Sequence, residues 1–92
     1  MSDRDPMPPL HPRAKADVLF RRVGEDWLLF DPSTQRIHVL NLAAALVWSH
    51  CSGELDAEEI RTRMTDAYGQ PVERQAVDEA LARFHAEGLL AP

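Results

Sequence analysis

The rhythm of hydrophobic and polar positions changes at Asn41, near the middle of the chain. Before it, three short runs rich in β-forming residues are separated by turn residues: VLFRRV at 18–23, WLLFD at 27–31 and RIHVL at 36–40. Runs of this kind joined by short linkers containing Gly, Pro or Ser are typical of antiparallel strands. The pattern therefore predicts a three-stranded antiparallel meander.

After Asn41 the spacing of apolar residues becomes helical. Residues 42–48 are apolar on every side, which is typical of a helix enclosed by its neighbours, and Asn41 can cap its start while Gly53 can end it. A second helix is predicted from Asp56, which begins a capping box, to Gly69, and a third from about Glu73 to Glu87. Three strands followed by three helices predict a small α+β domain of the winged helix-turn-helix type.

The N-terminal residues 1–17 contain four prolines and many charges, which predicts an irregular or flexible arm ahead of a single domain over residues 18–92. A chain of 92 residues has room for one modest core. Its N-terminus lacks the apolar segment of a secretory signal, and no apolar run approaches the roughly 20 residues that cross a membrane. We expect a cytoplasmic protein that is not inserted in a membrane.

Charge narrows the range of partners. The formal net charge is -5, and Lys15 is the only lysine in the sequence. A nucleic-acid-binding protein needs clustered cations to neutralise phosphates, so this balance disfavours nucleic acid as a partner.

Residues that could carry chemistry do not form a recognisable site in the sequence. The neighbours His50 and Cys51 lack metal-ligand or nucleophile spacing, and Cys51, the single cysteine, is expected to be a structural thiol. The other histidines, His11, His38 and His85, fall in different predicted elements. The carboxylates at the start of the second helix, Asp56, Glu58 and Glu59, are explained by capping and by the helix dipole. We therefore expect no metal, no cofactor and no enzymatic activity.

The run VLNLAAALVWSHCSGELDAEEIRTRMTDAYG at 39–69, followed by VDEALARFHAEGLL at 77–90, resembles the PqqD family. The shared features are an aliphatic strand, Leu-Asn, a small apolar helix, a Gly-bearing turn, an acidic capped helix ending near Tyr, and a last helix closing with Gly-Leu-Leu. The resemblance extends over roughly Arg13 to Leu90.

The resemblance implies a peptide-recognition module, also called a RiPP recognition element. Such a module binds the leader of a ribosomally made precursor peptide and presents it to a modifying enzyme, here one acting in trans, of a radical-SAM, protease, cyclase or kinase-like type. The leader adds as a strand beside the third strand, in the groove next to the third helix. The candidate peptide contacts are Arg36, Ile37, His38, Val39 and Leu40 on the strand, and Arg74, Val77, Leu81, Arg83 and Phe84 on the helix.

Physical reasoning supports the third strand as a docking edge, because an edge strand leaves a row of N–H and C=O groups unpaired. Ile37 and Val39 share one face of it, and the simpler expectation is that these two side chains belong to the core. A proline at His38 is expected to remove a donor and weaken leader binding, provided that the fold survives. Arg74 and Arg83 either meet acidic leader residues or form a solvated helix face.

Two alternatives stay open at this stage. The middle strand is apolar on both faces, so the N-terminal arm, a second copy of the chain or the partner enzyme could cover one of them, and a second copy would give a homodimer. A winged-helix DNA-binding regulator is the other alternative, although acidic residues outnumber the arginines on the third helix.

Overall fold

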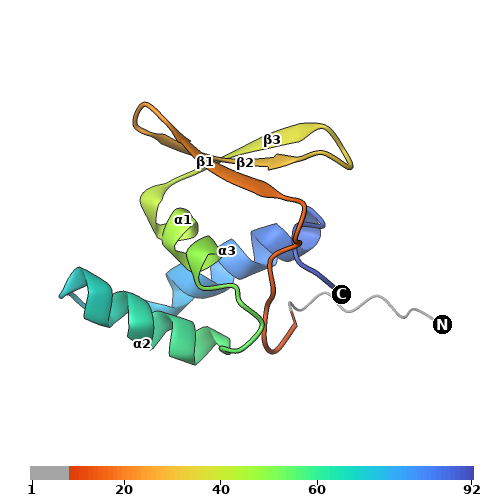
Figure 1. The fold of residues 1–92 in the computed structure, drawn as a ribbon. Helices are drawn as coiled ribbons and strands as arrows, with labels where there is room; N and C mark the ends of the chain where they lie inside the picture. The colour runs from red at the N-terminus through yellow and green to blue at the C-terminus, as the bar shows by residue number, and fades with distance from the viewer. Residues whose placement is uncertain (1–8) are drawn as a thin grey trace.

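The computed structural model describes residues 9–92 (Figure 1). The strands β1 (Leu19–Val23), β2 (Asp26–Asp31) and β3 (Arg36–Leu40) are followed by the helices α1 (Leu42–Ser49), α2 (Ala57–Tyr68) and α3 (Arg74–Ala86). The strands form one antiparallel sheet in the order β1-β2-β3. The predicted α+β arrangement, a three-stranded antiparallel sheet followed by three helices, is confirmed.

Two layers make up the fold. The sheet lies over α1 and α3, and α2 packs against these helices on the side away from the sheet (Figure 1). No helix in the described part of the chain is long and apolar enough to span a membrane.

Two tight turns fix the register of the sheet. Gly24, with φ of 62°, forms the first turn, across which Val23 pairs with Asp26. In the second turn the Asp31 carboxylate accepts hydrogen bonds from the Ser33 hydroxyl at 2.7 Å and the Ser33 N–H at 3.0 Å. The hydroxyl bond is the main reason why the pKa of Asp31 is lowered.

Side-chain caps begin two of the helices, as predicted. Asn41 Oδ1 accepts from the Ala44 N–H at 2.8 Å, and Asp56 and Glu59 form a complete capping box. The predicted end of the first helix was wrong, because α1 stops at Ser49. Gly53 instead lies where the N-terminal segment passes closely: a Cβ at this position would be 2.6 Å from Arg13 Nε.

Part of the predicted N-terminal arm belongs to the folded domain. Residues 12–15 run between the end of α1 and the C-terminal segment, and four backbone hydrogen bonds of 2.7–3.0 Å join them to Cys51, Gly53, Leu89 and Ala91. These bonds use carbonyl and N–H groups beyond the helix ends, so the segment is held in place without regular structure. Residues 1–8 of the arm lie outside the described residues.

One core joins the two layers. Leu29 and Leu40 point down from the sheet, and Trp48 of α1 meets Phe84 of α3 edge to face at 5.2 Å. Every helix and two of the strands contribute fully buried or nearly buried side chains, including Leu29, Leu40, Val47, Trp48, Ile60, Met64, Val77, Leu81 and Phe84.

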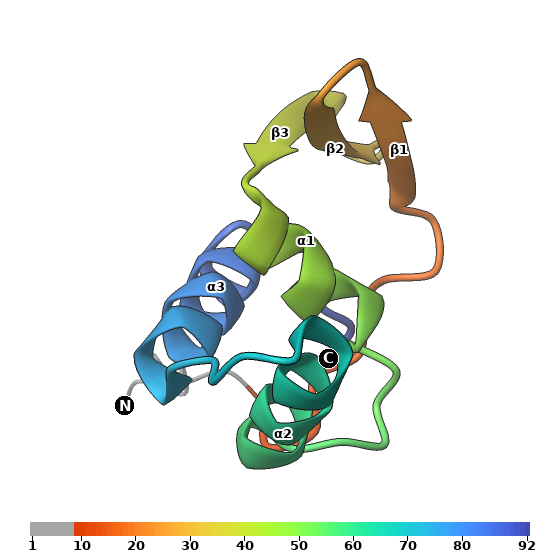
Figure 2. The ribbon, with the colours of Figure 1, turned by 90° about the vertical axis from the view of Figure 1, so that its left-hand side faces the viewer.

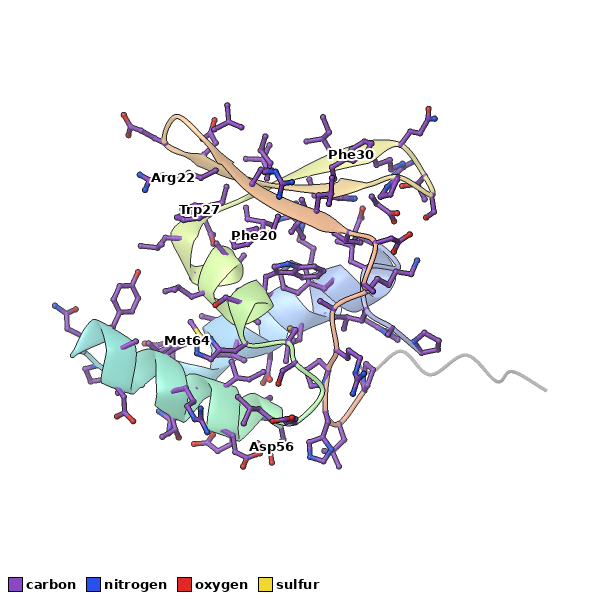
Figure 3. All side chains as sticks on the ribbon, in the orientation of Figure 1. Phe20, Arg22, Trp27, Phe30, Asp56 and Met64 are labelled. Carbon is purple, nitrogen blue, oxygen red and sulfur yellow. The ribbon has the colours of Figure 1, made fainter. Side chains whose placement is uncertain are left out.

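The two faces of the sheet differ in their cover. On the helix side Phe20 stacks on Trp27 at 5.4 Å, and Arg22 lies 5.1 Å from the Trp27 ring, whereas Phe30 points to the opposite side (Figure 3). That opposite, outer face carries the exposed side chains of Leu19, Val23, Ile37 and Val39. No described residue packs over it as a further layer (Figure 1).

Candidate functional site at the open edge of β3

The strand β3 forms one side of the sheet, with β2 on its inner flank and α3 below it (Figure 2). Its other flank pairs with no strand among the described residues. An edge of this kind presents backbone donors and acceptors at regular spacing to any extended chain that approaches it. The candidate site is therefore this edge together with the part of α3 that lies next to it.

The register shows which backbone groups face the edge. Neighbouring residues of an antiparallel strand bond alternately to one side and to the other. The two-residue turn makes Val23 and Asp26 a hydrogen-bonded pair, so even-numbered residues of β2 bond to β1 and odd-numbered ones to β3. The odd-numbered residues of β2 pair with positions 36, 38 and 40 of β3. We infer that the N–H and C=O groups of Ile37 and Val39 point to the open edge.

A contact from α3 agrees with this assignment. Arg83 Nη2 donates a hydrogen bond of 3.0 Å to the carbonyl oxygen of Val39. The side chain can reach this oxygen because the carbonyl points away from β2. Arg83 is thus the predicted helix residue that the structure brings to the strand.

The predicted strand residues divide between two faces. His38 and Leu40 lie below the sheet and are buried, with 7% and 3% of their surface exposed, whereas Ile37 and Val39 lie on the outer face, 63% and 56% exposed. The expectation that Ile37 and Val39 belong to the core was wrong, because the helical layer covers the other face. Arg36 is exposed at the start of the strand.

His38 connects β3 with the end of α3. Its Nδ1 lies 3.2 Å from a carboxylate oxygen of Glu87, just beyond the last turn of the helix. A buried imidazole with this partner holds the strand to the helix, so its side chain is a support beneath the edge and not an exposed peptide contact.

Three of the predicted helix contacts are core residues. Val77, Leu81 and Phe84 have at most 2% of their surface exposed, so their side chains stabilise the packing of α3 and do not reach a surface-bound peptide in this structure. Arg74 lies nine positions before Arg83, about 13 Å along the helix axis. Its guanidinium bonds to Asp78 at 2.9 Å and to Glu58 at 3.3 Å, away from β3.

A shallow groove begins where β3 ends, and none of its lining alanines is among the predicted peptide contacts. It has a volume of about 180 Å³ and lies between the start of α1 and α3. Small side chains form its floor and Glu79 and Arg83 its rim. Its lining residues are Asn41, Ala43, Ala44, Ala76, Glu79, Ala80 and Arg83. The alanines at positions 76 and 80, one helical turn apart, were the sequence signal for it.

The expected structural role of Cys51 agrees with its surroundings. The thiol is buried, donates to the Val47 carbonyl at 3.3 Å, and has its pKa raised to about 12 by burial. The neighbouring His50 lies by the Leu46 carbonyl instead, with Nδ1 2.8 Å from the oxygen. The two side chains therefore do not act as a nucleophile and its base.

One histidine lies closer to acidic residues than the sequence suggested. Ligand atoms of His11, Asp56 and Glu59 are all within 4.8 Å of one another. Both carboxylates already accept the backbone N–H bonds of the capping box, at 2.8 and 2.9 Å. They also lie at the positive end of α2, where a bound cation is disfavoured.

Comparison with models of protein families matches residues 26–90 to the family described as Coenzyme PQQ synthesis protein D (PqqD). The matched range begins with β2 and includes β3, the groove and all three helices. Neither a curated protein nor a solved structure gave a significant match to the chain.

Proposed function

Because the chain belongs to the PqqD family, we propose that it is a non-catalytic adaptor that binds a precursor peptide by strand addition to β3. The family is one of peptide-binding accessory proteins in the biosynthesis of coenzyme PQQ and of related ribosomally made products. The proposed ligand is the leader segment of such a precursor. The proposed partner is a modifying enzyme, of a radical-SAM, protease, cyclase or kinase-like type, which acts in trans.

The observation that supports this proposal best is the orientation of Ile37 and Val39. Their N–H and C=O groups can make four main-chain hydrogen bonds to an added strand, and one of them, the Val39 carbonyl, already accepts a bond from Arg83. At about 0.5–1.5 kcal/mol net for each bond, the three free groups contribute roughly 1.5–4.5 kcal/mol. Ordering a flexible peptide costs about 2–5 kcal/mol or more, so the backbone alone gives weak binding. Side chains of the peptide must supply the remaining affinity.

The alanine-lined groove is suited to one of these side chains. Alternate residues of an added strand would point towards the helical layer, and the groove lies on that side, directly beyond Leu40. Its floor is apolar, and the acidic rim residue Glu79 disfavours an anionic side chain there. An aliphatic or aromatic leader residue is the expected occupant.

The outer face gives the partner enzyme or a second copy of the chain a place to dock. An added strand would extend this face beyond Ile37 and Val39, next to the half-buried Leu28 and Phe30. The predicted self-association through this face stays a prediction.

Nuclear magnetic resonance with the isotope-labelled protein tests the proposal. The probe is the strongest-binding peptide recovered from a randomised 12-residue display library selected on the full chain. We expect its amide shift changes to cluster at positions 37–40 and along α3 from Ala76 to Arg83. Changes centred on the β1 edge or on α2 would refute strand addition to β3.

Filling the groove tests the side-chain anchor. Ala76→Leu should weaken binding of the same peptide at least tenfold, because the added side chain takes the space of the ligand's residue. Ala82→Leu is the matched control, since Ala82 is exposed on another side of the same helix and Leu and Ala have similar helix propensities. Equal affinities of the two variants would show that the groove does not hold a peptide side chain.

A separate titration distinguishes the proposal from DNA binding. An anisotropy titration with a random duplex at low salt should show no tight, salt-sensitive binding, because the chain is acidic and Arg74 is already paired with two carboxylates. Tight duplex binding would favour the regulator instead.

A further inference from the structure

Arg83 occupies a place that a bound peptide would need. Its bond to the Val39 carbonyl, at 3.0 Å, joins residues 44 positions apart and spans the gap between α3 and β3. An added strand would place one of its own N–H groups at this oxygen. In the free protein the guanidinium therefore stands in for the missing strand at one point of the edge.

The neutral partner of Arg83 is unexpected, because carboxylates lie one helical turn away on both sides. Glu87 is taken by His38 at 3.2 Å, and Glu79 accepts from Gln75 Nε2 at 3.1 Å. Among residues 9–92, Arg83 takes part in none of the salt bridges, which involve His38, Arg61 and Arg74. Its guanidinium is thus a cation at the mouth of the groove whose hydrogen-bond acceptor is an uncharged carbonyl.

We propose that Arg83 is a latch that makes the β3 edge selective for peptides carrying a carboxylate. This inference rests on the proposed function and adds the chemistry of its ligand. The peptide's N–H takes over the Val39 carbonyl, and its carboxylate takes over the guanidinium. A carboxylate offers the guanidinium Coulomb attraction and two parallel hydrogen bonds, which the neutral carbonyl does not, so the exchange favours an acidic peptide.

A peptide without a carboxylate gains less from the same exchange. It must displace Arg83 from Val39 and leaves the guanidinium to water, so its backbone N–H bond to the Val39 carbonyl only replaces the guanidinium bond, with little net gain. The latch therefore also protects the edge from indiscriminate pairing, including pairing with another β3 edge.

The geometry also sets the spacing of the ligand's residues. Arg83 approaches from the helical side, so the carboxylate must belong to a peptide residue that points inward near Val39. The next inward residue is two positions away and reaches the alanine-lined groove beyond Leu40. The recognised pattern is an acidic and a large apolar residue separated by one residue.

Paired peptides test the latch. The probe is the peptide from the display selection, compared with the same peptide in which the acidic residue is changed to its amide. The wild-type protein should bind the acidic form about tenfold more tightly, and Arg83→Gln should bind both equally. Arg83→Ala should bind the amide form severalfold more tightly than the wild type does, because the edge is no longer covered. Arg74→Ala is the matched control and should keep the wild-type preference.

The results distinguish the latch from a simple contact. If Arg83→Ala weakens binding of both peptides by the same factor, or leaves the acidic preference intact, the latch is refuted while strand addition stands. If the selection returns no peptide that binds at β3, the proposed function fails first. Sedimentation then tests the latch, because uncovering the edge should let two copies of the chain pair. Arg83→Ala should self-associate at severalfold lower concentration than the wild type or Arg74→Ala. Unchanged self-association of Arg83→Ala would refute the latch. Thermal unfolding of each variant checks that this exposed substitution leaves the fold intact.

Discussion

Proline at two adjacent positions of β3 should separate the backbone that holds the sheet from the backbone that faces the edge. In this register the N–H of His38 donates to β2, and the N–H of Val39 points away from the sheet to the open edge. We therefore compare His38→Pro with Val39→Pro. Each is measured against the alanine variant of the same position, so that loss of the side chain, including the pair of His38 with Glu87, is subtracted.

The magnitude follows from the groups involved. Proline at position 38 removes a ladder hydrogen bond, a net loss of about 0.5–1.5 kcal/mol, and leaves an acceptor of the central strand unsatisfied, at about 1–3 kcal/mol. Proline at position 39 removes an N–H that faces solvent. The restriction of φ to about -65° affects both positions alike and cancels. We expect the free energy of unfolding to fall by about 1.5–4.5 kcal/mol more at position 38 than at position 39.

Urea unfolding monitored by circular dichroism measures this difference. A domain of 92 residues has a free energy of unfolding of roughly 5–14 kcal/mol, which leaves the two proline and two alanine variants folded enough to measure. A shift of the urea midpoint reports the change in stability when the m-value is the same for all four variants. Equal costs at the two positions, or a larger cost at Val39, would refute the assignment of the open edge. A stable Val39→Pro variant should also bind the display-selected peptide about 2–13 times more weakly, the factor for one lost hydrogen bond. Proline at His38 thus tests the sheet, and the earlier expectation that it tests peptide binding does not suit this register.

Three further predictions concern stability. The pKa of Cys51 is raised to about 12, so its thiol should react with a disulfide reagent at pH 8 only as fast as the protein unfolds. The free energy of unfolding should also fall as pH rises from about 9 towards 12, because the thiol of the unfolded chain ionises at lower pH than that of the folded protein. Ser33→Ala should raise the lowered pKa of Asp31. The variant should therefore melt at a lower temperature than the wild type at pH 6, and the difference between the two melting temperatures should narrow as pH falls below about 4. Asp56→Ala should lose about 0.5–2 kcal/mol in urea unfolding through the broken capping box, whereas Asp56→Asn should keep most of it; equal losses would contradict a capping role.

The order of the elements could be predicted because it depends on local signals. Alternation before Asn41 and helical spacing after it are properties of neighbouring residues, and the caps at Asn41 and Asp56 formed as expected. The end of α1 was not predictable from Gly53, because this glycine makes room for the side chain of Arg13, forty positions earlier in the chain, and does not end the helix. The pairing of residues 12–15 uses backbone groups and leaves no pattern of side chains to detect.

The face of β3 was predicted wrongly for a related reason. Both faces of the strand carry apolar residues, and the choice between them depends on which one α3 covers. His38 can lie on the buried face because Glu87, far away in the sequence, gives its imidazole a partner. The pattern of polar and apolar residues along β3 could not show that His38 is buried, since burying a histidine without a partner would be costly.

The proposed site consists mainly of backbone groups and small side chains, and this has a consequence for how it can change. Ile37 and Val39 contribute through main-chain groups that exist whatever their side chains are. Selectivity is left to Arg83 and to the rim and floor of the groove, where Glu79 and Arg83 are exposed and Ala76 is only half-buried. Substitutions at Ala76, Glu79 and Arg83 disturb the core little, because other residues of α3, including Val77 and Phe84, hold the helix in the core. On the proposed binding mode, a few changes on one exposed side of α3 would retarget the domain to a different peptide, while the sheet edge would stay the same.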